Sequence, residues 1–230
     1  MADLTDFEAK FQVLTQVDGS ARFESFGTSV LCSVTGPIEP KARQELPTQL
    51  ALEIVVRPSK GVPTTREKLL EDKLRGVLTP VLVRYLYPRQ LCQICFQILE
   101  SGENEQFHSV RELSSCINAA FLALADAGVG LQNCFASCCA AVISNADQDV
   151  LINPSAEQLR NASSTHVLAF DSENGREPDS HLLLLESSGD FEEETLNKIL
   201  DAGEKACLQT VQRLRQALKT KVEQDLVWRT

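Results

Sequence analysis

The sequence predicts an α/β or α+β fold in which helices pack on mixed β-sheets. The first observation is a pair of β-rich runs, residues 28–35 and 50–57, which flank a loop with three prolines. The second is a pair of capping-box sequences, each followed by apolar residues at helical spacing. The third is the order of the elements, which is strands, helix, strand, helix, strands and helix.

An antiparallel meander is expected to open the chain. Alternation of apolar and polar residues predicts the first strand, and Asp18-Gly19 predicts a tight hairpin turn after it. Phe26-Gly27 predicts a second turn, into a run that ends at Gly36-Pro37. Pro58 ends the last run, because the residue before a proline avoids the helical region. The predicted strands of this part cover residues 11–17, 20–25, 28–35 and 50–57.

Two helices and a buried strand follow. Residues 64–67 read Thr-Thr-Arg-Glu and predict a capped helix start, and Pro80 kinks or ends this helix. The nearly continuous apolar run of residues 91–99 predicts a buried strand. Residues 109–112 read Ser-Val-Arg-Glu and predict a second capping box, which begins a helix that stops at Gly128.

The second half of the chain repeats the strand and helix order loosely, without a strict sequence repeat. A long last helix is expected to begin with a cap at Asp190, with three glutamates at residues 192–194 in its first turn. The predicted strands cover residues 135–143, 149–152, 165–170 and 181–185. We expect one domain, residues 1–230, with two loosely similar lobes at residues 10–128 and 129–230.

Composition narrows the class of protein. The 230 residues carry a formal net charge of −10, which argues against an autonomous nucleic-acid binder. No apolar run reaches the roughly 18 residues of a membrane span, and the acidic N-terminus does not resemble a secretory signal. The eight cysteines lie mostly in apolar runs, as buried thiols of a reducing compartment do. These features predict a nucleo-cytoplasmic protein without a membrane partner.

Local motifs for chemistry are weak. There is no glycine-rich phosphate loop. The three histidines are far apart in the sequence; core or edge positions are favoured for His166 and His181, and an exposed position for His108. Glu100, Glu103 and Glu105 are interpreted as a solvated acidic loop. An alternative is a zinc module built on two cysteine pairs, which the strand context disfavours. These pairs are Cys92 with Cys95 and Cys138 with Cys139. No metal site or cofactor is expected.

Several segments together resemble the RNase PH family. The segments that carry the likeness are residues 18–20, 26–34, 34–45, 63–68, 87–90 and 120–129. Those at residues 34–45, 63–68 and 87–90 are similar to one branch of the family, the RNase PH-like ring subunits of the eukaryotic RNA exosome in their fungal form. The resemblance covers nearly the whole chain and implies an RNase PH-type fold (ribosomal protein S5 domain 2-like), with mixed sheets packed with helices.

The resemblance also implies where catalytic residues would lie. Active members cleave RNA from the 3′ end with phosphate as nucleophile, and bind that phosphate with a Gly-Thr-Arg run that opens the long helix. The matching positions here are Arg111, Glu112 and Leu113. Aspartates that serve as metal ligands and acid are matched by Asn153, Leu159 and Thr165, which provide no carboxylate for Mg²⁺. Arg66 matches an arginine that active members direct at phosphate. These departures predict a subunit that keeps the shape and lacks the chemistry.

The implied role is that of a non-catalytic structural subunit of the exosome ring, in RNA processing and turnover. Its expected partners are other RNase PH-like subunits, paired in a six-membered ring, S1/KH cap subunits, a hydrolytic ribonuclease and RNA in the channel. Nucleus, nucleolus and cytoplasm are the expected locations. The residues considered for contact with the RNA backbone are Arg57, Lys60, Arg66, Arg84 and Arg89, with solvated or interface charge as the favoured interpretation. The alternative is a weak ribonuclease, alone or as a homodimer, using Glu112, Asp147 and Asp149.

Overall fold

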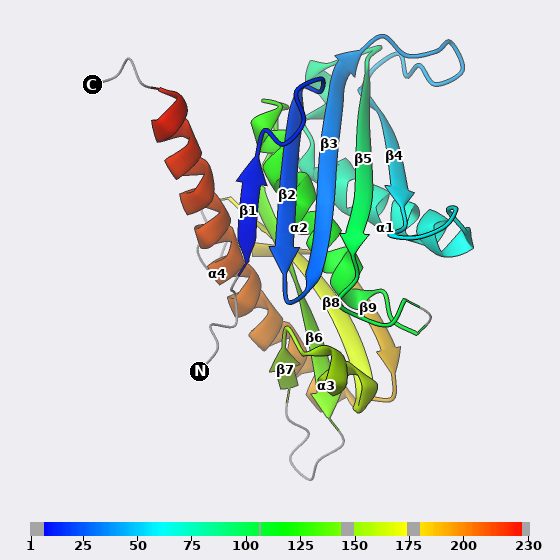
Figure 1. Cartoon of the computed structure of the whole chain (residues 1–230), viewed down its shortest axis with the longest axis vertical. Coiled ribbons are helices and arrows are strands. Elements are labelled where there is room, and N and C mark those ends of the chain that lie inside the picture. The colour runs from blue at the N-terminus through cyan, green and yellow to red at the C-terminus, as the bar shows by residue number, and fades with distance from the viewer. Residues whose placement is uncertain (1–6, 106, 144–149, 174–179, 227–230) are drawn as a thin grey trace.

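The computed structural model describes residues 7–105, 107–143, 150–173 and 180–226, which form two β-sheets packed with helices (Figure 1). This arrangement confirms the predicted fold class. The first half contains β1 (Glu8–Phe11), β2 (Gly19–Ser25), β3 (Thr28–Ile38), β4 (Ala51–Arg57), α1 (Thr65–Val81), a 3₁₀ turn (Arg84–Leu86), β5 (Leu91–Glu100) and α2 (Val110–Asp126). The second contains β6 (Cys134–Ile143), β7 (Val150–Ile152), α3 (Ala156–Arg160), β8 (Ala162–Ser172), β9 (Ser180–Gly189) and α4 (Glu193–Asp225).

The first sheet has the strand order β1-β2-β3-β5-β4. Its pairs are antiparallel except for β4, which runs parallel to β5. A parallel pair needs a crossover connection, and α1 provides it between these two strands. The strands predicted at residues 20–25, 50–57 and 91–99 are confirmed to within one residue at each end.

The first strand lies earlier in the chain than predicted. β1 ends at Phe11, the backbone of Gln12 turns with φ 50°, and a loop occupies residues 12–18. The expected strand at residues 11–17 and the tight turn at Asp18-Gly19 are therefore wrong. The alternation was misleading because the apolar residues Val13 and Leu14 are 42% and 38% exposed, so the pattern did not reflect burial.

Strand β3 continues to Ile38, past its predicted end at Gly36-Pro37. β2 begins at Gly19, opposite Val34, so the β3 residues beyond Val34 face no strand on that side. A proline lacks the N–H donor of a ladder bond and is tolerated in a strand where no such bond is needed.

Helix α2 lies between the two sheets. It contacts β2 and β3 on one side and β6 and β8 on the other. Residues 110–124 are all buried, including the polar residues Arg111, Glu112 and Asn118. Buried polar groups are costly unless they are hydrogen-bonded, so these side chains must find partners inside the protein.

The second sheet has the antiparallel order β7-β6-β8-β9, with α4 on its outer face. Cys139 and Ala141 of β6 pack in the core that includes α2, while Cys138 and Ala140 pack against α4. The strands predicted at residues 135–143, 165–170 and 181–185 are confirmed. Of the strand predicted at residues 149–152, Val150–Ile152 is confirmed, and Asp149 lies outside the described residues.

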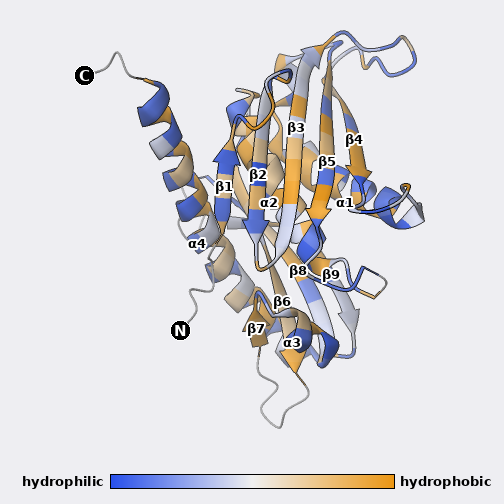
Figure 2. Ribbon diagram, viewed as in Figure 1, coloured by the Kyte–Doolittle hydropathy of each residue, from blue (hydrophilic) through white to orange (hydrophobic). Residues whose placement is uncertain are grey.

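Hydropathy follows this layering. Figure 2 shows many apolar residues on β3 and β5 and hydrophilic residues towards the C-terminal end of α4. No helix in the described part of the chain is long and apolar enough to cross a membrane.

The helix starts agree with the sequence in one case and differ in three. The capping box of Thr64 and Glu67 before α1 is confirmed. The box predicted at residues 109–112 is wrong, because Ser109 makes no capping bond. The cap predicted at Asp190 is also wrong, since α4 begins after Glu192. The short helix α3, capped by Ser155, was not predicted.

The cysteines are free thiols, six of them buried. The four positions of the zinc alternative do not assemble, because Cys138 and Cys139 face different cores and Cys92 and Cys95 lie in the other sheet. Within the described ranges, no group of three His, Cys, Asp or Glu residues is arranged to hold a metal ion.

Candidate functional site at the amino end of helix α2

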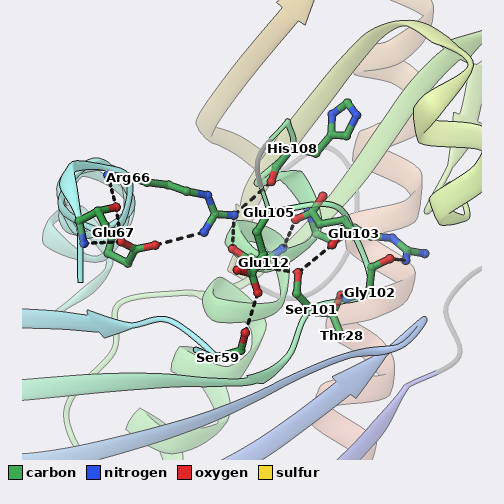
Figure 3. A network of polar contacts seen from close by, with 12 residues as sticks. Thr28, Ser59, Arg66, Glu67, Ser101, Gly102, Glu103, Glu105, His108 and Glu112 are labelled. Carbon is green, nitrogen blue, oxygen red and sulfur yellow. Dashed lines mark hydrogen bonds and ion pairs between the residues drawn. The ribbon is translucent and has the colours of Figure 1, made fainter. Parts of the chain in front are cut away.

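The amino end of α2 receives a carboxylate from the loop before it. Oε1 of Glu103 accepts hydrogen bonds from the backbone N–H groups of Arg111 and Glu112, both at 3.0 Å (Figure 3). The first N–H groups of a helix have no intrahelical partner, and Glu103 satisfies two of them in place of the expected cap at Ser109. The prediction of a solvated acidic loop is therefore wrong for Glu103, which is 8% exposed.

The Glu103 carboxylate is held in an unfavourable environment. Its Oε2 is buried and has no hydrogen-bond partner among the described residues. Burial raises the pKa of Glu103 to about 7, and the nearby Glu112 carboxylate adds to the rise, while the amides of Arg111 and Glu112 oppose it. The side chain is thus a partly protonated group near neutral pH.

A second carboxylate at this site is neutralised by an arginine. Oε2 of Glu112 lies 2.5 Å from Nη2 of Arg66, and its Oε1 accepts the hydroxyl of Ser101 at 2.7 Å. Arg66 also donates to the carbonyl of His108 and pairs with Glu67. The expected role of Glu112 as a capping-box residue is therefore wrong, since its carboxylate points at Arg66 rather than at the backbone.

Both groups of this ion pair have perturbed pKa values. Burial raises the pKa of Glu112, and the bonds from Ser101 and Arg66 counteract only part of that effect. Burial alone lowers the pKa of Arg66, but Glu112 and Glu67 outweigh it and raise the pKa above its usual value. The guanidinium of Arg66 therefore stays charged. Arg66 is the residue matched to a phosphate-directed arginine, and its charge is neutralised within the protein by Glu112.

Arg111 binds the backbone of the turn at Phe26 and of the loop at Gly102. Its Nη1 donates to the carbonyl oxygens of Phe26 at 2.8 Å and Gly102 at 2.9 Å, and its guanidinium lies 5.8 Å from the centre of the Phe26 ring. Leu113, the third residue of the stretch matched to the phosphate-binding run, is 1% exposed and belongs to the core. This stretch therefore makes internal contacts with all three of its side chains.

A small polar cavity lies beside this turn. It has a volume of about 20 Å³, room for about one water molecule. Small-molecule sites commonly measure several hundred Å³. Its polar lining includes Arg111, Ser114, Ser115, Asn118, Ser137 and Asn153, and Phe7, Phe23 and Phe26 also line it. An RNA end cannot enter a space of this size without movement of these side chains.

The three positions matched to aspartates do not converge on the cavity. Asn153 lines it, with φ 51°, and its Oδ1 faces Cys139. Leu159 is 1% exposed and packs in the core, and Thr165 is buried within β8. In the alternative ribonuclease arrangement, Glu112 is already paired with Arg66, and Asp147 and Asp149 lie outside the described residues.

The three histidines have structural surroundings. His166 is buried, with its ring nitrogens 2.8 Å and 2.9 Å from the hydroxyls of Ser187 and Ser164, and burial lowers its pKa. His181 is exposed beside Asp171, and His108 is half-buried.

The five basic residues considered for RNA contact are divided between the two ends of β4. Arg57 ends the strand, and Lys60 follows it; both are exposed. Arg84 donates to the carbonyl of Leu50 before the strand, and Arg89 pairs with Glu45 in the same region. Only the end of β4 that carries Arg57 and Lys60 adjoins the α2 site, where Arg66 is already paired with Glu112.

Local sequence patterns could not reveal Glu103 as a site residue. The amides that it binds lie eight and nine residues further along the chain, and its neighbours Glu100 and Glu105 resemble it in type. Asn118 was also missed, although it is a polar residue within an apolar helix face. It exchanges two 2.9 Å hydrogen bonds with the backbone of Ser137 on β6.

Two family models match this chain. Domain 1 of the 3′ exoribonuclease family, RNase PH, matches residues 3–130, and domain 2 of that family matches residues 134–206. The Saccharomyces cerevisiae exosome complex component RRP46 is 56% identical over 96% of this chain and 98% of its own length. The Schizosaccharomyces pombe exosome complex component rrp46 is 35% identical over 52% of this chain and 50% of its own length.

Solved structures share the fold. Rice Rrp46 superposes with a TM-score of 0.81 at 23% identity, covering 94% of this chain and 96% of that one. A chain of an archaeal exosome core gives a TM-score of 0.70 at 16% identity, covering 91% and 86%. The resemblance expected from the sequence is confirmed, and the chain belongs to the RNase PH family of 3′ exoribonucleases.

Proposed function

We propose that this protein is a non-catalytic structural subunit of the RNA exosome core ring. Similarity to the yeast exosome component over almost the whole of both chains supports the ring role. The observation that carries the non-catalytic part is the internal use of the α2 site. Glu112 neutralises Arg66, Glu103 takes the helix amides, and the adjoining cavity has room for only about one water.

In this role the chain supports 3′-to-5′ RNA processing and degradation, including rRNA maturation, without cleaving RNA itself. It pairs with another RNase PH-like subunit in a ring of six, and S1/KH subunits cap the ring. RNA passes through the channel to a separate hydrolytic ribonuclease. The protein acts in the nucleus, nucleolus and cytoplasm.

Two physical features favour this role over autonomous RNA chemistry. A net charge of −10 repels RNA from an isolated chain, so contact with RNA depends on basic residues pooled from several subunits. Transition-state stabilisation of a phosphoryl group needs positive groups aimed at it, and here Arg66 is aimed at a carboxylate and Arg111 at two backbone carbonyls instead.

The test is an RNA degradation assay with the purified chain. A single-stranded RNA with a free 3′ end is incubated with Mg²⁺, with and without phosphate, and nucleoside diphosphates and monophosphates are measured. No product is expected in either condition, while the chain still co-purifies with the other ring subunits. Phosphate-dependent diphosphates contradict the non-catalytic role, and phosphate-independent cleavage that follows the chain through purification supports the alternative weak ribonuclease.

Within the ring, we place RNA-backbone contact at Lys60, with Arg57 beside it. Both are exposed at the end of β4 near α2. Lys60→Glu is expected to shorten the RNA segment that the assembled ring protects from nuclease. It is also expected to reduce the slope of log binding constant against log salt concentration by about one. Arg89→Glu, at the other end of β4, is the matched control. Equal effects of the two changes contradict this placement.

A further inference from the structure

Two cysteine side chains face each other where helix α4 packs on the outer face of the second sheet. Sγ of Cys138, on β6, lies 3.5 Å from Sγ of Cys207, on α4. The two side chains are buried, with exposed fractions of 1% and 0%. They are 69 positions apart in the chain, so the packing of α4 on the sheet brings them together.

The approach of α4 to the sheet is close at this point because a glycine faces the strands. Gly203 lies one helical turn before Cys207, so the two residues share one face of α4. A Cβ at position 203 would lie 2.8 Å from Cδ2 of Leu168, which is closer than real Cβ contacts. Leu168 is the β8 partner of Cys138 in the strand pairing. The helix backbone therefore runs near enough to the sheet for the two thiols to meet.

The separation of the two sulphur atoms is near that needed for a covalent bond. A disulfide has an S–S length of about 2.05 Å, so the atoms must approach each other by roughly 1.5 Å. Small rotations about the Cα–Cβ bonds of Cys138 and Cys207 move the sulphur atoms by such an amount. A cross-link between residues so distant in sequence also restricts the unfolded chain, which stabilises the folded state.

The closed structure keeps both groups as thiols. The Cys138 thiol donates to the carbonyl of Gly203 at 3.6 Å, and the Cys207 thiol donates to the carbonyl of Leu168 at 3.8 Å. The hydrogen bond with Cys207 and burial raise the pKa of Cys138 well above its usual value. A thiol reacts as the thiolate, so the pair is unreactive while α4 covers it.

We propose that Cys138 and Cys207 form a dithiol site that a low-molecular-weight disulfide, such as glutathione disulfide, oxidises to an intramolecular disulfide linking α4 to β6. Transient opening of α4 exposes the pair to the oxidant and to water, where a thiolate forms. Thiol reductants reverse the reaction. This inference does not depend on the ring-subunit role, since the bond is detected without partners, RNA or activity.

The reaction consists of two thiol–disulfide exchanges. In the first, the thiolate of one cysteine attacks glutathione disulfide, the S–S bond of the oxidant breaks, and one glutathione leaves as its thiolate. In the second, the other cysteine attacks the protein sulphur of the mixed disulfide and releases the second glutathione. The two protein sulphurs lose two electrons in total, glutathione disulfide gains them, and the two thiol protons pass to the two glutathione molecules.

The experiment oxidises the folded full chain with glutathione disulfide at pH 8, blocks the remaining thiols and maps tryptic peptides without reduction. Trypsin releases residues 206–213 with Cys207 as their single cysteine, and residues 112–160 with Cys138 and three others. We expect these two peptides to be linked, and the oxidised chain to contain two fewer thiols. Its Tm is expected to rise by about 5–15 °C and to return to the initial value with dithiothreitol.

Variants identify the bonded residues. Cys138→Ala and Cys207→Ala are each expected to lose the linked peptides and the rise in Tm, and either one is sufficient if the other does not fold. Cys139→Ala is the matched control, because Cys139 is adjacent to Cys138 and packs in the other core. It is expected to keep both effects. Folded wild type whose peptide 206–213 carries only the blocking group or glutathione overturns the proposal, as does a link that survives Cys138→Ala.

The rate of oxidation tests the need for opening. Urea at concentrations below the unfolding transition increases the population of partly opened states. The linked peptides are therefore expected to form faster as urea is added in this range. A rate that does not depend on urea contradicts the requirement that α4 open first, and linked peptides without a rise in Tm contradict the stabilising effect of the bond.

Discussion

The ion pair between Arg66 and Glu112 allows a quantitative prediction. Their closest atoms are 2.5 Å apart, the Glu112 side chain is fully buried, and the Arg66 side chain is 25% exposed. Two unit charges about 4 Å apart interact by about 4 kcal/mol at an effective dielectric constant of about 20. Partial exposure of Arg66 reduces this value. We expect Arg66→Ala to lower the free energy of unfolding by about 3 kcal/mol, because it leaves a buried carboxylate unpaired.

Urea unfolding at pH 8 and pH 5 measures this effect and its origin. Burial raises the pKa of Glu112 above its unfolded value even with Arg66 present, and loss of Arg66 raises it further. A carboxyl group with a raised folded pKa favours folding at low pH, and that contribution is lost as the pH rises through the folded pKa. The deficit of Arg66→Ala is therefore expected to be smaller at pH 5 than at pH 8.

Two controls separate the pair from general effects of losing an arginine. Arg57→Ala removes an exposed side chain and is expected to change stability by less than about 0.5 kcal/mol. The double change Arg66→Met with Glu112→Leu removes both charges and is expected to recover most of the lost stability. A loss below about 1 kcal/mol for Arg66→Ala, as for a surface pair, or a deficit that does not depend on pH, refutes the reasoning.

Three further predictions concern the same layers of the fold. Burial raises the pKa of Glu103 to about 7, so the free energy of unfolding is expected to fall as the pH rises from about 4.5 to about 7. Glu103→Gln is expected to remove this fall, which amounts to at most about 3 kcal/mol, when unfolding is measured across that pH range. Gly19→Ala places a Cβ 2.4 Å from the backbone nitrogen of Ala127 and is expected to cost at least about 2 kcal/mol by thermal unfolding. Gly76→Ala, in an open position of α1, is expected to stabilise by about 0.5–1 kcal/mol in the same assay, and the reverse ranking of the two glycines contradicts the packing of β2 on α2.

Sequence patterns predicted the elements whose cause is local. The capping box of Thr64 and Glu67 lies within four residues, and it begins α1 as expected. β6 is buried on both faces, so its apolar run predicted a strand without knowledge of its partners, and the apolar run of β5 did so although only one of its faces is fully buried. Family membership was also readable from the sequence, because its segments are spread along almost the whole chain.

The predictions of the first strand and of the α2 cap were wrong for the same reason. In both places a plausible local pattern competed with a contact made by a more distant residue. Ser20 accepts the N–H of Gln12 through its carbonyl and the N–H of Leu14 through its hydroxyl, which closes a loop where alternation predicted a strand. At the start of α2, Glu103 accepts the backbone N–H groups of the first turn, where Ser109 was expected to form the cap.

The sequence by itself determined the order of strands and helices, the RNase PH-type fold and the residue types at the positions matched to catalytic ones. Tertiary structure alone decided what those residues do. Arg66 and Glu112 are 46 residues apart, and they meet only because α1 and α2 both pack under the first sheet. The state of Glu103 likewise depends on burial between the loop and α2, because desolvation and hydrogen bonding are properties of the folded surroundings and not of the residue type.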